Sequence, residues 1–465
     1  MSRISLFCLL SVLALSLSAS TQRRNVIPVV LISIDGLKPD YVLEADRHGL
    51  KLPNLRRFVK DGAFASAVTG VTPTVTYPSH TTLVTGVSPA KHGIFANTPF
   101  DPFSKNQGGW CWYAEDIRVP TLWDACAAAG LKTASVDWPV TVSAKIDFNI
   151  VQMWRAATPD DRKLIRALST PGLLTEAEKA IGNYPEGYDY TVEADKRRAA
   201  FNVYLLEKKR PAFLTTYFAG LDEVQHAHGP NSREAYAALE DIDALVGQVR
   251  AAAEKLGNGK AVVAVASDHG FAPISKSLNL NAAFREAGLI EVEAGKLKSW
   301  RAITWNSGGS AFVVLKDKND EAARRKAREI LQRLAADSAS GLFRFYEGDA
   351  AMKLGGFPEA AFVIGTKPGT YVGGSFELPI VRDIKHGGGH GFLAELPEMD
   401  SSFFIAGAGI PTAKNLGRID MRDIAPTLAG LIGVKLPMAE GRDLLKDQKI
   451  QRAKISTAEA QRRQR

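Results

Sequence analysis

The chain has 465 residues, of which 45% are hydrophobic, and a formal net charge of +8. A chain of this length can bury a large core, and we expect one large α/β domain with insertions. Seven basic and two acidic residues lie between Lys446 and Arg465. The rest of the chain is therefore close to neutral, which argues against a surface for duplex nucleic acid. We expect residues 446–465 to form a basic, flexible tail.

The N-terminus has the pattern of a cleaved secretory signal, which we assign to residues 1–20. An apolar run from Leu6 to Leu17 follows Arg3, and small residues come directly after it. This run is too short to span a bilayer. We expect cleavage after Ser18 or Ser20, which would export the mature protein to the periplasm or the extracellular space without a membrane span.

Two cysteines, Cys111 and Cys126, remain after the signal is removed. An oxidising compartment would allow them to form a disulfide. Two cysteines alone define no disulfide framework, so the sequence leaves open whether they pair.

Three apolar, strand-like runs each end on an aspartate. The runs are VVLISID, AFLTTYFAGLD and AVVAVASD, and they end at Asp35, Asp222 and Asp268. Such runs are typical of buried parallel strands, and in open α/β sheets ligands bind beyond the carboxyl ends of the strands. We therefore expect the three carboxylates to converge on one edge of the sheet. Because His226 and His269 accompany two of them, a bound metal is the simplest explanation of the clustered charge.

Helical spacing and further apolar runs predict the remaining elements of the core. Helices are expected at Pro53 to Asp61, Leu122 to Gly130, Ser232 to Leu256, Asp320 to Ala336 and Arg422 to Ile432. Strands are expected at Thr133 to Trp138, Ala311 to Leu315, Ala361 to Gly365 and Phe403 to Gly409. Ser232 can cap the longest helix, which Gly257 follows. Residues 147–187 show no clean periodicity, and we expect them to form a cap or loop excursion.

A threonine-rich segment, TPTVTYPSHTTLVTG from Thr72 to Gly86, precedes HGIFAN, which ends at Asn97. A hydroxyl at the start of a helix, above carboxylates and a metal, can act as a nucleophile because the metal lowers its pKa. Most threonines in such turns only cap helices. The segment therefore indicates a nucleophile only when it is taken together with its neighbours.

Taken together, these segments resemble the nucleotide pyrophosphatase/phosphodiesterase family of the alkaline phosphatase superfamily. The matching pieces are IDG (34–36), TVTYP (74–78), TGVSPAKHGI (85–94) with Asn97, DWP (137–139), LDEVQHAHGP (221–230), SDHG (267–270) and GHGF (389–392). They occur in the family's order and cover nearly the whole mature chain. The resemblance implies a three-layer α/β sandwich with a mostly parallel central sheet over residues 26–445. Cap insertions are then expected at about 98–120, 147–187 and 276–385.

The resemblance also implies two zinc ions as cofactors. One would be held by Asp222, His226 and His390. The other would be held by Asp35, Asp268, His269 and the oxygen of Thr76. Each zinc then has three protein ligands besides the nucleophile, which leaves room for a substrate. Three carboxylates and two zinc ions leave one positive charge, which an alkoxide at Thr76 would cancel.

The mechanism implied by the resemblance is an in-line attack of Thr76 on phosphorus. A phosphothreonine would form and would then be hydrolysed by water, with net retention at phosphorus. The Asn97 amide, together with a backbone N–H near Tyr77, would donate to a non-bridging phosphoryl oxygen. The Tyr77 side chain matches a position that stacks on a nucleobase in the family.

Some of these assignments have competitors in the sequence. Thr74 is the other candidate nucleophile, and Thr76 is preferred because it directly precedes the aromatic-Pro pair. His390 is preferred over His386 because it lies in the GHGF piece.

Other residues have an ordinary structural interpretation beside the functional one. We expect His80 and His92 to hydrogen-bond loops and His228 to be structural. Trp110, Trp112 and Tyr113 can line a substrate cleft or simply pack, half-buried.

The sequence therefore predicts a secreted, zinc-dependent phosphodiesterase or pyrophosphatase that acts on nucleotides or related small phosphodiesters. The alternative is a phosphomonoesterase of the same superfamily, which would need additional positive groups near the nucleophile; Arg155 keeps this possibility open. A sulfatase is disfavoured because the Cys-x-Pro-x-Arg motif and its serine counterpart are absent. An inert binding protein on the same fold is disfavoured by the intact ligand set and Thr76.

Overall fold

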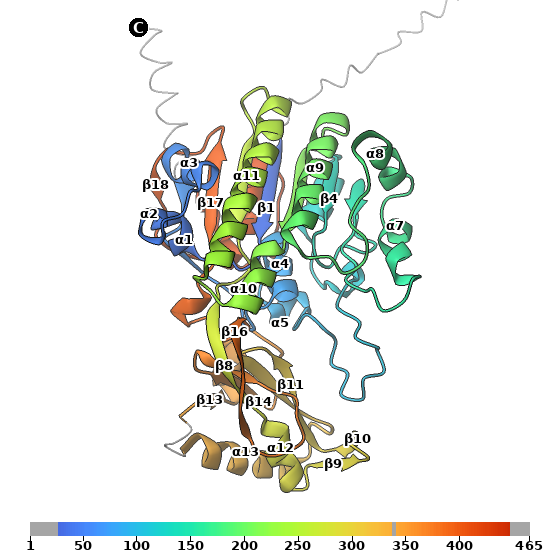
Figure 1. Cartoon of the computed structure of the whole chain (residues 1–465), viewed down its shortest axis with the longest axis vertical. Helices are drawn as coiled ribbons and strands as arrows, with labels where there is room; N and C mark the ends of the chain where they lie inside the picture. The colour runs from blue at the N-terminus through green and yellow to red at the C-terminus, as the bar shows by residue number, and fades with distance from the viewer. Residues whose placement is uncertain (1–26, 337–340, 447–465) are drawn as a thin grey trace, which may run out of the picture.

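The computed structural model describes residues 27–336 and 341–446. The predicted signal peptide lies outside these residues, as does the predicted tail beyond Lys446. The main body of the described chain is built on an eight-stranded sheet with the order β18-β2-β17-β7-β1-β6-β4-β5 (Figure 1). Its strands are β1 (Val29–Ile34), β2 (Ala63–Phe64), β4 (Thr133–Val136), β5 (Phe148–Ile150), β6 (Phe213–Phe218), β7 (Val262–Ala266), β17 (Phe403–Gly407) and β18 (Lys414–Asn415).

The three central strands of this sheet are the apolar runs that the sequence singled out. Every residue of β1, β6 and β7 is buried, which explains why these runs are continuously apolar rather than alternating. Strand β1 lies between β6 and β7 and is parallel to both, with Ile34 opposite Phe218 and Ser33 opposite Ala266. The carboxyl ends of all three strands therefore meet at one edge of the sheet.

Helices cover both faces of the sheet, so the expected three-layer sandwich is confirmed. One face carries α3 (Pro53–Asp61), α9 (Val192–Lys208) and α11 (Arg233–Leu256), whose apolar side chains form one core cluster with the sheet. The other face carries α4 (Thr76–Thr85), α6 (Leu122–Ala128) and α15 (Ile424–Ile432), which form a second cluster. The Ser232 hydroxyl accepts a hydrogen bond from the Ala235 N–H, so the predicted cap of α11 is also confirmed.

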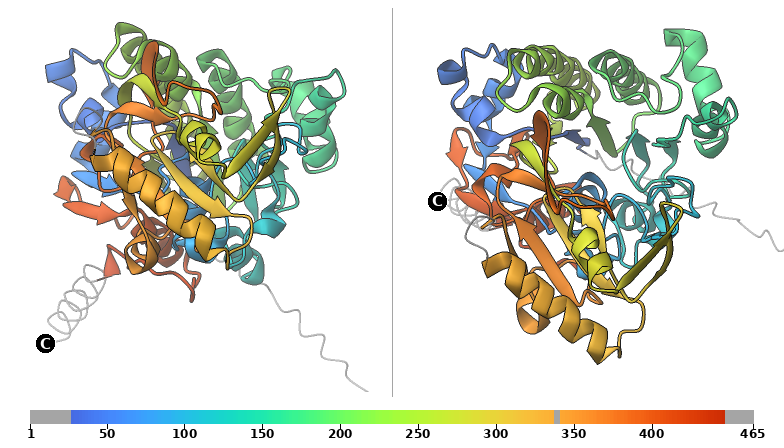
Figure 2. Two further views of the ribbon diagram at one scale, coloured as in Figure 1. Left: turned by 90° about the horizontal axis from the view of Figure 1, so that it is seen from below. Right: turned by 60° about the horizontal axis from the view of Figure 1, so that its bottom comes forward.

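A second lobe is inserted between β7 and β17. The chain enters it through β8 (Ala272–Leu278) and leaves it through β16 (Val381–Gly389), and these strands pair with Ala272 opposite Gly389. The lobe contains a four-stranded sheet of β11 (Ala302–Ser307), β12 (Ser310–Leu315), β14 (Phe362–Thr366) and β13 (Phe343–Tyr346). It has a hydrophobic core of its own. Helix α13 (Glu321–Ala336) lies on the side of the lobe that faces away from the main body (Figures 1 and 2).

The shorter elements complete the described chain. The other helices are α1 (Pro39–Leu43), α2 (Ala45–His48), α5 (Pro89–His92), α7 (Leu164–Leu168), α8 (Leu173–Ile181), α10 (Gly220–His228), α12 (Leu280–Glu286) and α14 (Gly348–Lys353). The other strands are β3 (Ala67–Thr69), β9 (Ile290–Glu293), β10 (Lys296–Trp300), β15 (Gly369–Val372) and β19 (Arg418–Asp420). Among the described residues, no helix is both long enough and apolar enough to cross a membrane.

The segment 147–187 differs from the expected cap excursion. It begins with β5, which extends the main sheet because Phe148 pairs with Ala134 of β4, and it continues with α7 and α8. A strand of three residues is too short to show a period, so no periodic pattern marks it in the sequence. The two cysteines are both free: Cys126 belongs to the core cluster on one face of the sheet, and Cys111 packs against the cluster on the other.

Candidate active site

Three aspartates lie together beyond the carboxyl ends of the central strands. Asp35 directly follows β1, and Asp268 lies two residues beyond the end of β7. Asp222 lies in the first turn of α10, the helix that follows β6. Asp222 and Asp268 both raise the pKa of Asp35, which shows that the carboxylates are within electrostatic range of each other. The convergence expected from the sequence is present in the structure.

Asp35, Asp268 and His269 form the first group of possible metal ligands. Their ligand atoms all lie within 4.8 Å of one another. The Nε2 atom of His269 is 3.1 Å from Oδ1 of Asp35 and 3.3 Å from Oδ2 of Asp268. All three side chains are buried, so water does not screen the two negative charges.

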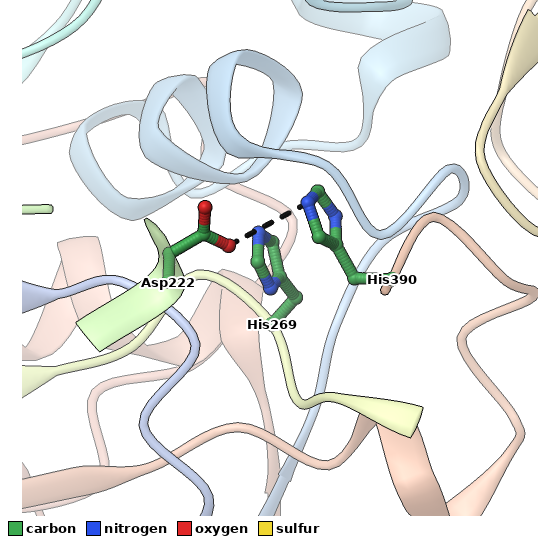
Figure 3. Close-up of side chains that lie close together, drawn as sticks. All are labelled: Asp222, His269 and His390. Atoms are coloured by element: carbon green, nitrogen blue, oxygen red, sulfur yellow. Dashed lines mark ion pairs between the residues drawn. The ribbon is translucent and has the colours of Figure 1, made fainter. Parts of the chain in front are cut away.

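Asp222, His269 and His390 form the second group, and their side chains point toward one another (Figure 3). Oδ1 of Asp222 lies 3.6 Å from Nε2 of His390, and Oδ2 of Asp222 lies 3.3 Å from Nε2 of His226. His226 and His390 therefore contact the same carboxylate, each through a different oxygen of Asp222. His269 belongs to both groups, whereas the family resemblance assigned it only to the group with Asp35.

The three histidines are held in the same tautomer by the backbone. The Nδ1 atoms of His226, His269 and His390 each lie 3.0 Å from a carbonyl oxygen, those of Gly388, Gly270 and Thr74 respectively. A carbonyl oxygen can only accept a hydrogen bond, so each Nδ1 carries a proton, and Nε2 presents a lone pair wherever the ring is neutral. Burial lowers the pKa of His269 to about 4 and the pKa of His390 to about 3, so both rings are neutral at physiological pH.

The carboxylates are also oriented by hydrogen bonds that leave one oxygen free. The Tyr217 hydroxyl donates to Oδ2 of Asp35. The backbone N–H groups of Gly36 and His269 donate to Oδ1 of Asp268, at 3.2 Å and 3.0 Å. These contacts are the supports that metal ligands usually have.

Four of the ligand atoms are buried and have no hydrogen-bond partner among the described residues. They are Oδ1 of Asp35, Oδ1 of Asp222, Oδ2 of Asp268 and Nε2 of His269. Such unpartnered polar atoms destabilise a fold unless something binds them. Burial and the two neighbouring carboxylates also raise the pKa of Asp35 well above its ordinary value. Oxygen and imidazole donors of this kind fit divalent transition metals, zinc in particular.

Thr76 is the first residue of α4, and it lies at the same cavity as Asn97, Asp222 and His390. Oδ1 of Asn97 accepts a hydrogen bond from the Tyr77 backbone N–H at 2.9 Å. This contact directs the amide NH₂ of Asn97 away from Tyr77 and leaves it available as a donor. It also engages the Tyr77 N–H, which the sequence had offered as a second donor to substrate.

Thr74, the competing nucleophile, is committed to structural contacts. Its hydroxyl donates to the carbonyl of Phe392 at 2.9 Å, and its own carbonyl accepts from Nδ1 of His390. Thr74 is fully buried and is not among the residues that line the cavity. Of the two candidate threonines, Thr76 is therefore the one whose side chain is at the cavity.

The cavity beside Thr76 has a volume of about 490 Å³. It is lined by Thr76, Asn97, Trp110, Trp154, Tyr188, Tyr190, Ala219, Asp222, Glu223, His226, Ala227 and His390. The Tyr77 side chain is fully buried and packs against Trp110, with ring centroids 5.2 Å apart. The expectation that Tyr77 stacks on a base is therefore corrected: its ring supports Trp110, which faces the cavity.

The other aromatic residues divide into those that line the cavity and those that do not. Trp112 is buried and Tyr113 is exposed, and neither lines the cavity. Trp154, Tyr188 and Tyr190, which do line it, were missed by sequence reasoning. They lie in or just beyond residues 147–187, which show no clean periodicity. In this region only the density of aromatic residues could have indicated a binding site.

His80 and His92 are both buried, and His80 bonds within its own helix α4 rather than to a loop. His80 contacts the Thr76 carbonyl through Nδ1 at 2.8 Å, and His92 is hydrogen-bonded to Thr82 and the Ile94 N–H. His386 is exposed whereas His390 is buried, which agrees with the preference for His390.

A buried ion-pair network positions the helix that carries Asp222. Nε of Arg198 lies 2.8 Å from Oδ2 of Asp137, and its Nη1 lies 2.8 Å from Oδ1 of Asp195. The Asp195 carboxylate in turn accepts from the N–H groups of Ala219 and Gly220, where α10 begins. The DWP segment thus has a structural role through Asp137. Sequence reasoning missed Asp195 and Arg198 because nothing local distinguishes them.

Comparison with known proteins identifies the family. Residues 29–392 match the family described as type I phosphodiesterase / nucleotide pyrophosphatase. The chain belongs to this family, as the sequence resemblance indicated. Its fold agrees, since human ectonucleotide pyrophosphatase/phosphodiesterase 5 superposes with a TM-score of 0.65 at 20% identity, over 90% of this chain and 99% of that one. The murine counterpart, solved as the inactive T72A variant in complex with AMP, gives a TM-score of 0.64 at 20% identity, over 89% and 97%.

Relatives of known sequence match over about half of this chain. An uncharacterized pyrophosphatase/phosphodiesterase of Schizosaccharomyces pombe is 29% identical over 252 residues, which are 53% of this chain and 45% of that protein. Human ectonucleotide pyrophosphatase/phosphodiesterase family member 1 is 25% identical, over 52% and 23%. Human bis(5'-adenosyl)-triphosphatase ENPP4 is 25% identical, over 54% and 49%. The match thus spans less than half the length of each of these relatives.

Proposed function

We propose that this protein is a two-zinc phosphodiesterase and nucleotide pyrophosphatase that uses Thr76 as its nucleophile. The observation that carries the proposal is the position of Thr76. It opens α4 at the cavity that Asp222, His226 and His390 also line. A hydroxyl placed beside two groups of metal ligands is suited to attack on phosphorus.

Each ligand group would hold one zinc ion. Asp222, His226 and His390 would hold the first, and Asp35, Asp268, His269 and Thr76 would hold the second. When bound, the metals would lower the pKa of the nucleophile and stabilise charge on the leaving oxygen. The backbone carbonyls that fix the Nδ1 protons leave Nε2 of the neutral His269 and His390 rings ready to bind without loss of a proton.

The reaction steps on this chain's own atoms are two displacements. Thr76 gives up its hydroxyl proton as Oγ forms a bond to phosphorus, the bond to one ester oxygen breaks, and the leaving group departs with that oxygen and takes up a proton. Water then attacks phosphorus, the bond between phosphorus and Oγ breaks, Thr76 regains a hydroxyl proton from that water, and the phosphate monoester is released. The Asn97 NH₂ would donate to a non-bridging oxygen in both steps, because its Oδ1 is held by the Tyr77 N–H.

The charge of the cavity supports a diesterase over the rival monoesterase. No lysine or arginine is among the described residues that line it. Arg155, the residue that kept the rival open, is engaged elsewhere, with its Nε 3.1 Å from Asp161. A diester needs less positive charge around phosphorus than a monoester dianion does. The names of the relatives and the AMP bound to the murine protein support nucleotides as substrates.

A comparison of two chromogenic substrates tests this proposal. We expect the zinc-loaded protein to hydrolyse the 4-nitrophenyl ester of thymidine 5'-phosphate with a higher kcat/KM than 4-nitrophenyl phosphate. A preference of tenfold or more for the monoester would replace the proposal with the monoesterase.

We further propose that the protein is exported, on the strength of the signal-like residues 1–20. Sequencing of the purified protein should find a new N-terminus between Ala19 and Gln22. Recovery of an intact Met1 from membranes would contradict export by this signal.

A further inference from the structure

The cavity beside Thr76 has one wall of aromatic rings. Trp154 lies at its centre, with its ring centroid 5.2 Å from that of Trp110 and 5.2 Å from that of Tyr188. Tyr190 extends the wall, with its centroid 4.6 Å from that of Tyr188. The Tyr188 side chain is 40% exposed, so the wall keeps an accessible ring. Aromatic faces of this kind attract planar groups and cations.

Among the described residues that line the cavity, Glu223 is the one charged residue that the ligand groups do not use. It is half-buried on α10, directly after Asp222. The ionisable groups that act on it are both carboxylates, Asp189 and Asp222. Since Asp222 would be bound to zinc in the working enzyme, Glu223 and Asp189 keep an uncompensated negative charge next to the aromatic wall.

A carboxylate in this position discriminates between substrates by their charge. A half-buried charge is poorly screened, so a second anion brought close to it is repelled and a cation is attracted. The aromatic rings act in the same direction, because their faces are negative and favour cations. No lysine or arginine in the described lining would offset the repulsion of an anionic group at the aromatic wall.

We propose that Glu223 determines the charge of the substrate group that occupies the aromatic wall. This group is the one that stays esterified to phosphorus after the leaving group departs. Cationic groups are accepted best, neutral nucleosides are accepted, and groups with a second phosphate are rejected. The inference rests on the proposed function, since it concerns the same cavity and the same reaction.

Three 4-nitrophenyl phosphodiesters with one leaving group test the inference. The retained group is thymidine in the first, thymidine 3'-phosphate in the second and choline in the third. For the wild type, we expect kcat/KM to be about tenfold or more lower for the 3'-phosphorylated ester than for the thymidine ester. In Glu223→Gln this ratio should shrink about tenfold, and kcat/KM for the choline ester should fall about tenfold relative to that for the thymidine ester.

The matched control is Glu329→Gln, which removes an exposed carboxylate from α13 in the second lobe. Both ratios should equal those of the wild type in this variant. Ratios that do not change in Glu223→Gln would overturn the inference, as would a wild type that prefers the 3'-phosphorylated ester. If the zinc-loaded wild type hydrolyses none of the three esters, the proposed function itself fails; hydrolysis with unchanged ratios removes only the role of Glu223.

Discussion

The imidazole rings of His269 and His390 are stacked, with centroids 3.6 Å apart and planes inclined by 8°. His269 lies just before β8 and His390 just after β16, so the two rings come from the two ends of the second lobe. Because β8 and β16 pair with each other down to Ala272 and Gly389, this ribbon fixes the spacing of the rings. The lobe is therefore part of the framework of the ligand cluster.

Gly389→Ala should weaken metal binding through this ribbon. A Cβ at residue 389 would lie 1.8 Å from the Tyr371 hydroxyl, which accepts a hydrogen bond from the His390 N–H. Displacing either group moves His390, and the loss of such supports typically costs 10- to 100-fold in metal affinity. Titration with zinc should show this loss. Gly374→Ala, where the nearest atom is 3.7 Å away, is the control, and equal affinities in the two variants would contradict the prediction.

Removal of metal should reduce stability as well as activity. In the metal-free protein, three buried or partly buried carboxylates face one another with free ligand atoms. A metal that binds only the folded state stabilises it in proportion to the logarithm of its concentration over Kd. Chelator should therefore abolish hydrolysis and lower the Tm, and zinc should restore both. Full activity in chelator, with no metal found by elemental analysis, would refute a metal-dependent site.

Arg198→Ala should be among the most destabilising substitutions in the main body. It would leave Asp137 and Asp195 buried without their cation, which typically costs about 3–5 kcal/mol. Because Asp195 holds the start of α10, zinc binding should weaken in the same variant. Denaturant unfolding and zinc titration measure the two effects. Arg325→Ala, at an exposed position of α13, should change neither, and wild-type stability of Arg198→Ala would disprove the role of the network.

Much of the site was predictable because its signals are local. Asp35 directly follows β1, and Asp268 lies two residues beyond β7. The continuous apolar runs of these two strands indicate that the strands are buried on both faces. Parallel neighbours end at the same edge, so convergence follows from the fold class alone. Asp222 and His226 are four residues apart on one helix, which places them on one face.

The rest depends on contacts between distant segments that no local pattern encodes. Arg198 joins Asp137 to Asp195 only because α9 lies against the end of β4 and the start of α10. Three rings of the aromatic wall, those of Trp154, Tyr188 and Tyr190, lie in or just after a stretch whose strand β5 is too short to show a period. The expected contact of Tyr77 with a base was wrong because the position of a residue in a motif does not determine the direction of its side chain. In this structure the Tyr77 ring is directed into the core.

Asn97 provides a sharp test of transition-state stabilisation. Asn97→Asp keeps an oxygen that can accept from the Tyr77 N–H but removes the NH₂ donor and adds a negative charge. Loss of one such donor typically lowers kcat by about 10²- to 10³-fold. We expect both Asn97→Asp and Asn97→Ala to show at least this loss with the thymidine ester. If Asn97→Asp retains wild-type kcat, the amide does not contact the phosphoryl group.

The central claim is that Oγ of Thr76 is the nucleophile that bonds to phosphorus. The kcat of Thr76→Ala tests this claim most directly. A methyl group cannot form the phosphoester, so we expect kcat for the thymidine ester to fall on the order of 10³-fold or more, while elemental analysis still finds zinc. Thr74→Ala, which keeps the carbonyl that holds His390, should lose far less activity. Full activity in Thr76→Ala, or equal losses in the two variants, would contradict the account.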